Sequence, residues 1–303
     1  MNSNASSKLK LILSMAVFGT LGLFTRNIQV SSGELSLYRA VLAAVLITAF
    51  LTLTRQKLDW EGIRKDLKYL ILSGAAMGFN WIFLFQAYKY TTISVSTLCY
   101  YFAPVIVTVA CVFLFREKLS VKQILCFVMS TVGLVLIIAT GGLSGSGTDA
   151  IGIAYGLGAA ALYAAVILLN KYMKHTEGVP RTLFQFFAAI IVLTPYVAAT
   201  SGFHLEVLDA KGWICLLILG LFHTGVTYCL YFSSLKELKG QEVSILSYID
   251  PLVAVLVSTV ILGEAMTLMQ GLGGLLILGF TLLNELSPKE KQKTHHSFKA
   301  YRL

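Results

Sequence analysis

Ten long apolar runs constrain this chain more than any other feature of its sequence. A helix needs about 20 mainly apolar residues to cross the hydrocarbon part of a bilayer. Charged residues make up 13% of the chain, whereas a soluble domain carries roughly 25%. The chain therefore lacks the polar surface that would keep ten apolar helices in water, and we predict an all-α integral membrane protein with ten transmembrane helices. The runs cover residues 9–25, 35–54, 67–87, 93–115, 124–140, 152–169, 183–200, 213–235, 243–262 and 268–283.

The net charge of +9 does not indicate a nucleic-acid partner, because the basic residues lie in short clusters between the apolar runs. Neither an aromatic-basic sheet signature nor a zinc-finger spacing is present. The expected surroundings are the lipid bilayer. Twenty of the 24 Lys and Arg residues fall in segments on the side of the N-terminus, and three fall on the other side. The positive-inside rule then predicts both termini in the cytoplasm, in a bacterial inner (plasma) membrane.

One segment occurs twice. Both copies show Tyr, Pro, Glu, Ser or Thr, and Gln at the same spacing, and each residue stands 147 positions from its partner. The repeat divides the chain into a first five-helix half over 1–141, a linker over 142–151, a second half over 152–285 and a basic cytoplasmic tail over 286–303. The pairs are Tyr101/Tyr248, Pro104/Pro251, Glu117/Glu264, Ser120/Thr267 and Gln123/Gln270.

Because five is an odd number, the second half enters the membrane upside down relative to the first. Inverted repeats of this kind are a known design of secondary transporters. Two such halves can exchange conformations, so that one arrangement opens inward and its mirror image opens outward.

The repeated residues have recognisable physical roles. Pro104 and Pro251 are predicted inside helices, where each removes a backbone hydrogen bond and produces a kink; a static kink and a pivot are both open. Glu117 and Glu264 are predicted in tight turns at opposite membrane surfaces, where they fix the turn or act as a gate or proton site. Ser120 and Thr267 each begin a capping box for the next helix.

Arg39 and Asp250 are the deeply placed charges. Ionisable residues inside membrane helices are costly and face the bundle interior or a water-filled path. Arg39 has the alternative of reaching the outer surface with its long side chain. For Asp250 three roles are open: pairing with Arg39, binding a substrate ammonium group, or carrying a proton.

Other polar and aromatic residues lie mid-helix, where packing competes with ligand binding as the explanation. The candidates for a substrate cavity, besides Arg39 and Asp250, are Asn80, Trp81, Tyr101, Tyr163, His223, Tyr228 and Tyr248. The chain contains no Walker loop, no nucleophilic triad and no cysteine spacing typical of a metal site. We therefore predict that the protein is not an enzyme and uses neither a metal nor a cofactor.

These residues together resemble the EamA-like branch of the drug/metabolite transporter superfamily. The resemblance extends from about residue 8 to residue 285. It rests on Pro251, Gly263, Glu264 and Thr267 in the second half, on Pro104, Arg116, Glu117 and Ser120 in the first, on Arg39 in the second helix, and on the glycine-rich last helix from Gly271.

The resemblance implies export of small metabolites, amino acids among them, through a cavity lined by helices one, three, four, six, eight and nine. It departs from the family pattern at Asp250, where glutamate is usual before the proline, at Arg116, where glycine is usual, and at Phe18, where tryptophan is usual.

The leading hypothesis is a secondary, non-ATP exporter of a small metabolite such as an amino acid, acting by alternating access. An importer or facilitator on the same scaffold is the first alternative. An intramembrane lipid-modifying enzyme and a non-transporting membrane subunit are further ones. The sequence does not name the substrate, leaves proton or ion coupling open, and leaves open whether the protein is a monomer or a homodimer.

Overall fold

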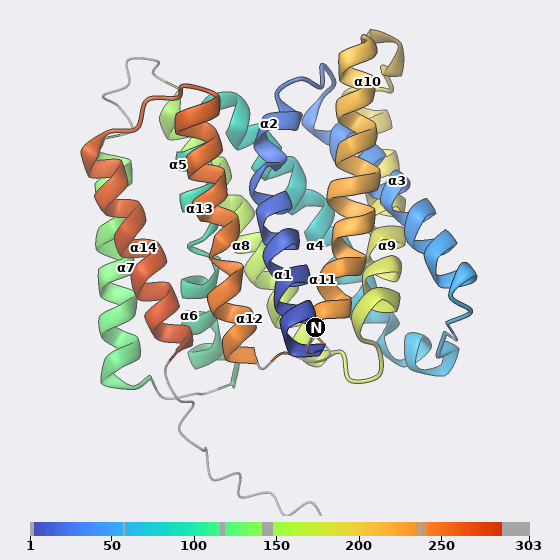
Figure 1. The fold of residues 1–303 in the computed structure, drawn as a ribbon, viewed down its shortest axis with the longest axis horizontal. Coiled ribbons are helices and arrows are strands. Elements are labelled where there is room, and N and C mark those ends of the chain that lie inside the picture. Colours follow the sequence, from blue (N-terminus) through green and yellow to red (C-terminus); the bar gives the residue numbers. More distant parts are fainter. Residues whose placement is uncertain are drawn as a thin grey trace, which may run out of the picture.

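The computed structural model describes residues 3–56, 58–115, 119–140, 148–235, 238 and 240–286, and this part of the chain forms helices and turns without a β-strand. The helices pack side by side, with their axes running mostly from one edge of the molecule to the other (Figure 1). The elements of the first half are α1 (Ser3–Gly19), α2 (Leu21–Thr25), α3 (Ser32–Leu53), α4 (Trp60–Tyr90), α5 (Ile93–Tyr100), α6 (Ala103–Phe115) and α7 (Val121–Thr140).

The second half begins with two long helices and continues with interrupted ones. Its elements are α8 (Asp149–Tyr172), α9 (Gly178–Thr200), η1 (Leu205–Val207), α10 (Ala210–Leu217), η2 (Ile218–Val226), α11 (Thr227–Leu235), α12 (Gly240–Ser247), α13 (Ile249–Leu256), η3 (Val257–Ile261) and α14 (Leu268–Glu285).

Eight helical stretches in the described residues are long and apolar enough to cross a membrane. Two shorter apolar stretches, Ile245–Ile261 and Leu268–Asn284, correspond to the last two runs of the sequence. Apolar side chains such as Val45, Ile191 and Leu275 are exposed on the outside of the bundle. In lipid this exposure is favourable, because the hydrocarbon is as apolar as the side chains. The architecture is that of an integral membrane protein.

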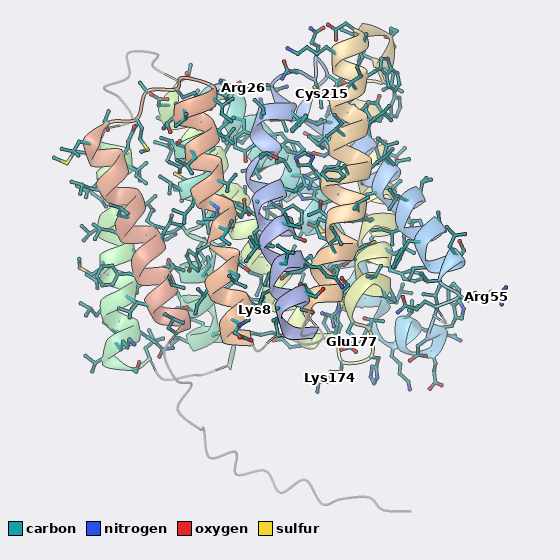
Figure 2. The ribbon with its side chains drawn as sticks, viewed as in Figure 1. Lys8, Arg26, Arg55, Lys174, Glu177 and Cys215 are labelled. Atoms are coloured by element: carbon teal, nitrogen blue, oxygen red, sulfur yellow. The ribbon has the colours of Figure 1, made fainter. Side chains whose placement is uncertain are left out.

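Charged residues mark two opposite edges of the bundle. α1 begins and α14 ends at the same edge (Figure 1). Lys8, Arg55 and Lys174 lie toward that edge, and Arg26 lies toward the opposite one (Figure 2). We refer to these as the Lys8 edge and the Arg26 edge.

Two spans are broken at equivalent positions. α5 ends just before Tyr101 and α6 begins two residues later, while α12 and α13 are separated by Tyr248. Pro104 and Pro251, which the sequence analysis predicts at helix kinks, each stand in the first turn of the helical piece that follows the break. There the missing proline N–H is one that has no partner within the helix, so the proline costs little.

Wide π-helical turns replace regular α-helix in two places of the second half, η2 and η3. In η2 the hydroxyls of Thr224 and Thr227 donate to the carbonyls of Leu219 and Phe222, five residues back, at 2.8 and 2.9 Å. π-helical turns inside α-helices are frequent at functional sites, since they displace the side chains that follow.

The two halves pack against each other through equivalent helices. α4 of the first half packs along α8 and α9, and the equivalent span of the second half, α10 to α11, packs along α1 and α3. α7 and α14, the last helices of the two halves, pack on each other. Their backbones meet closely at Gly133 and Gly273, where a Cβ on either glycine would lie 2.5 Å from the other's carbonyl oxygen.

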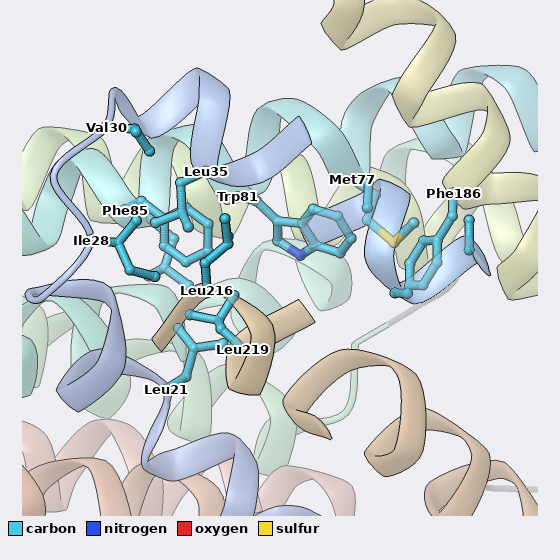
Figure 3. Packing of buried hydrophobic residues seen from close by; sticks show 14 of the residues in the cluster. Leu21, Ile28, Val30, Leu35, Met77, Trp81, Phe85, Phe186, Leu216 and Leu219 are labelled. Carbon is cyan, nitrogen blue, oxygen red and sulfur yellow. The ribbon is translucent and has the colours of Figure 1, made fainter. Parts of the chain in front are cut away.

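The largest buried apolar cluster draws on both halves. Leu21, Trp81 and Phe85 come from the first half, and Phe186 and Leu216 come from the second (Figure 3). The cluster holds α3, α4, α9 and the α10 to α11 span together on one side of the polar residues described next.

Candidate functional site between the two halves

Arg39 on α3 is buried, with a side chain only 3% exposed. Its Nε donates to the hydroxyl of Thr224 at 2.6 Å, and its guanidinium carbon lies 4.5 Å from the ring centre of Trp81 and 5.7 Å from that of Phe85. No carboxylate in the described residues forms an ion pair with it. Cation–π contacts and one hydrogen bond therefore hold a buried positive charge that lacks a counter-ion.

Asp250 supplies the opposite charge from the second half. It stands in the first turn of α13, where the helix dipole favours an anion. One of its oxygens accepts a hydrogen bond from the hydroxyl of Tyr101 at 2.8 Å, and the side chain is partly exposed. Asp250 forms no ion pair with a described cation, so its pairing with Arg39, one of the three roles left open by the sequence, is not formed in this structure.

Three tyrosines lie near both of these charges. Tyr88, Tyr100 and Tyr228 each lie within electrostatic range of both Arg39 and Asp250. Together with Tyr101, these tyrosines and the two charges form what we call the Arg39–Asp250 site. The charges come from different halves, so the site spans the boundary between the halves.

Aromatic rings extend the site on both sides. The ring of Tyr100 stacks on that of Tyr163 at 5.2 Å between centroids, and Tyr163 is 39% exposed. On the other side, Phe186 contacts Trp81 at 5.4 Å and Tyr228 at 5.7 Å, in edge-to-face geometry. Such rings offer an apolar wall with phenol hydroxyls at its margin, which suits an amphipathic ligand.

His223 contacts the segment around α2 rather than the residues of the Arg39–Asp250 site. Its Nε2 lies 2.8 Å from the hydroxyl of Thr20, and its Nδ1 lies 3.4 Å from the carbonyl of Ile218. The imidazole also packs edge-to-face on Phe24 at 4.8 Å. These contacts are those of a satisfied interior histidine that joins η2 to Thr20 and α2.

Two further candidates contribute to packing. The amide of Asn80 donates to the carbonyl of Ala159 at 2.6 Å, which joins α4 to α8. Tyr248 is buried, and its ring lies 6.2 Å from that of Tyr101 across the two helix breaks.

Glu264 lies at the Arg26 edge. Its carboxylate forms an ion pair with Arg26 and accepts hydrogen bonds from the backbone N–H of Ile93, at 2.8 Å, and from the hydroxyl of Ser258. It thus satisfies a backbone N–H that has no partner within its own helix, and this donor belongs to α5 of the first half. Glu117, its partner in the repeat, lies outside the described residues.

Both capping boxes are present. Thr267 and Gln270 exchange two hydrogen bonds of 2.9 and 3.2 Å at the start of α14, and Ser120 and Gln123 exchange two of the same lengths before α7. The two boxes stand at the same position in the two copies of the repeat and have matching geometry.

The part of the chain that the structure describes contains no group of three His, Cys, Asp or Glu side chains placed to hold a metal ion. All five cysteines lie in helices as free thiols.

Sequence reasoning missed Thr20, Tyr88, Thr224 and Ser258. Threonine and serine in membrane helices usually bond to their own helix backbone, so their presence carries little information. Only the π-helical turns bring Thr224 to Arg39 and Ser258 to Glu264, and no residue pattern in the sequence marked those turns.

Comparison with known proteins agrees with the fold. The sequence profile of the EamA-like transporter family matches residues 6–139 and again residues 150–285. A solved crystal structure aligns with a TM-score of 0.62 at 17% identity, over 93% of this chain and 98% of the other, and shows the same fold.

Relatives in other organisms carry transporter names. "Uncharacterized transporter YxxF" of Bacillus subtilis is 30% identical over 279 residues, or 90% of this chain and 87% of that protein. An "Uncharacterized transporter" of Archaeoglobus fulgidus is 27% identical over 90% of this chain and 94% of its own length. "Uncharacterized inner membrane transporter YicL" of Salmonella typhimurium is 23% identical over 97% and 99%. The chain belongs to the EamA-like transporter family, within the drug/metabolite transporter superfamily of integral membrane proteins.

Proposed function

We propose that this protein is a secondary transporter that exports a small amphipathic metabolite, such as an amino acid, by alternating access between two inverted halves. The halves are residues 1–141 and 152–285, joined by a linker over 142–151 and followed by a basic tail over 286–303. Family membership, the apolar spans and the repeated break at Tyr101 and Tyr248 support this organisation. The two shorter apolar stretches complete the ten membrane helices of the proposal.

The start of α1 and the end of α14 lie at the same edge of the molecule, which supports an even number of membrane crossings (Figure 1). In this proposal the Lys8 edge faces the cytoplasm of a bacterial inner membrane, because most Lys and Arg residues of the sequence fall in segments on the side of the N-terminus. The linker then lies on the outer side, and the second half runs in the opposite direction to the first.

The single observation that carries the function is the pair of unpaired charges at the boundary between the halves. A buried guanidinium without a counter-ion is costly in a membrane protein, and so is a carboxylate with one phenol partner. A ligand with an anionic group near Arg39 and a cationic or donor group near Asp250 would lower both costs at once. Its apolar part would lie against Trp81 and Tyr100.

The test is an export assay that compares three proteins at equal expression in a bacterial host. Wild type, Asp250→Asn and Glu206→Gln are expressed, and extracellular metabolites are compared by mass spectrometry. Glu206 is an exposed carboxylate in η1 and serves as the control for loss of one negative charge.

We expect a metabolite that is enriched outside wild-type and Glu206→Gln cells but not outside Asp250→Asn cells. Depletion of a metabolite from the medium in the same pattern would mean import by the same site. Equal profiles of wild type and Asp250→Asn, also in uptake assays with amino acids, would contradict the assignment of the site.

A further inference from the structure

Glu264 connects the two halves at the Arg26 edge through an unusually complete set of partners. The residue follows η3 in the second half, and its side chain is only 7% exposed. Both Arg26, at the end of α2, and the backbone N–H of Ile93, at the start of α5, belong to the first half. Ser258 adds a second link, because its hydroxyl oxygen accepts from the backbone N–H of Ser94 at 3.2 Å.

The backbone conformation after η3 places the carboxylate of Glu264 against the first half. The π-helical turn η3 ends at Ile261, and Gly263 has a φ of +66°, a conformation that side chains with a Cβ rarely adopt. The chain then turns back, so that the backbone N–H of Glu264 donates to the carbonyl of Ser258 at 3.0 Å. The carboxylate consequently lies under the N-terminus of α5, where the helix dipole also favours an anion.

The repeat provides a comparison at the Lys8 edge. An offset of 147 pairs Ser258 with Cys111, and the offset of 145 that aligns the first helix of each half pairs Arg26 with Lys171. In the structure Lys171, the counterpart of Arg26, contacts Cys111, the counterpart of Ser258. Lys171 Nζ lies 3.2 Å from the sulfur of Cys111. In each half a basic residue near the end of the first membrane span thus reaches the other half, but Lys171 contacts Cys111 itself, whereas Arg26 contacts Glu264, to which Ser258 also donates. The partners differ in strength, since a thiol is a weak hydrogen-bonding group.

We propose that Glu264, Arg26, Ser258 and the first turn of α5 form a clamp that closes the Arg26 end of the transport path, and that this clamp opens in each transport cycle. The inference rests on the proposed alternating-access function and names the contacts that break and re-form during it. In a protein of inverted repeats, the contacts made at one edge by one half are exchanged with those made at the other edge by the other half. Opening at the Arg26 edge is then accompanied by a tighter contact around Lys171 at the Lys8 edge.

The clamp can act as a switch because only a few charged contacts join Glu264 to α2 and to α5. Loss of one charge-assisted hydrogen bond shifts a two-state equilibrium by about tenfold. The Arg39–Asp250 site lies on the same broken helices, since Asp250 precedes η3 and Tyr101 follows α5. Ligand contacts at the site can therefore favour or oppose opening of the clamp.

The experiment measures access to a reporter cysteine between the site and the clamp. Val253 lies one turn after Asp250 and packs against Gly19, so Val253→Cys is placed in a background from which the five native cysteines have been replaced. A membrane-impermeant maleimide is applied to intact cells and, separately, to inverted vesicles, so that either orientation of the Arg26 edge is covered. The labelling rate reports how often this end of the path is open.

We expect Glu264→Gln to raise the labelling rate from the side of the Arg26 edge by about tenfold. Arg26→Gln should give a smaller rise, because the bonds of Glu264 to Ile93 and Ser258 remain, and Arg26→Lys should stay near the starting rate. Glu206→Gln is the matched control and should leave the rate unchanged.

The proposal is wrong if Glu264→Gln labels at the starting rate, or if Glu206→Gln raises the rate equally. Where size-exclusion chromatography shows that Glu264→Gln does not fold, the contrast between Arg26→Gln and Arg26→Lys decides: a rise in the first alone supports the clamp, and equal rates contradict it. Because labelling needs no substrate, a negative result here leaves the export assay intact, and a negative export assay leaves the clamp testable.

Discussion

The two halves of this protein break the same helix at the same place but differ in the span that precedes it. Tyr101 and Tyr248 mark breaks at matching positions, each followed within three residues by proline. By contrast, α4 is a regular helix of 31 residues, whereas its counterpart passes from α10 through the π-helical η2 into α11. Shared geometry therefore coexists with a local difference in the winding of one span.

The difference shows which parts of the repeat carry chemistry. Thr224, which bonds Arg39, corresponds to Met77 of α4 at the offset of 147, and Asp250 corresponds to Ala103. Features that recur, such as the breaks and the capping boxes, build the frame of each half. Features found in one half only, such as Asp250 and η2, create the charged site between them.

Among the substitutions that test this difference between the halves, we expect the largest effect on transport from a change at Arg39. Arg39→Leu should reduce transport at least about tenfold, because the charged hydrogen bond to Thr224 and the ligand's anchor are lost. Stability should stay equal or rise, since a buried charge without a counter-ion opposes folding. Flux is measured in the export assay and stability by thermal unfolding in detergent. Arg64→Leu, at an exposed position of α4, is the control. Retained flux together with lowered stability would show that Arg39 is structural.

The capping boxes provide a test of equivalence between the halves. Thr267→Ala and Ser120→Ala should each lower the free energy of unfolding by about 1 kcal/mol, because each leaves a helix N-terminus without its cap. The loss should be larger for Thr267, which is partly buried, than for exposed Ser120. Chemical unfolding in mixed micelles measures both. Thr194→Ala, at an exposed hydroxyl within α9, should change little; a loss there as large as at Thr267 would show that the caps are not special.

The smallest effect is expected at the two prolines. Pro104→Ala and Pro251→Ala should change the free energy of unfolding by about 0.5 kcal/mol or less, since first-turn prolines remove no helical hydrogen bond. Pro195 stands inside α9, so Pro195→Ala restores a backbone donor and should stabilise the protein more than either. The same unfolding measurement compares the three. A large gain at Pro104 or Pro251 would mean that these prolines strain their helices.

Many of the helices and their caps could be predicted from the sequence, whereas most contacts of the candidate site could not. The spacing of Glu264 to Thr267 and Gln270 predicts a residue in a turn before a helix. The backbone donor to Glu264, Ile93, lies 171 residues away in the chain, and no local pattern can indicate such a partner. The sequence predicts Arg39 and Asp250 as deep charges, yet their separation and the tyrosines near both of them depend on how the halves pack.

The sequence by itself determined that this chain folds in a membrane, that its two halves are related, and where α7 and α14 begin. These properties follow from local physics: apolar length and capping hydroxyls. Only the tertiary structure decided which charges are left without counter-ions and which carboxylate joins the two halves at the Arg26 edge. Those outcomes depend on contacts between residues more than 100 positions apart, and the π-helical turns that adjust them are set by packing rather than by residue type.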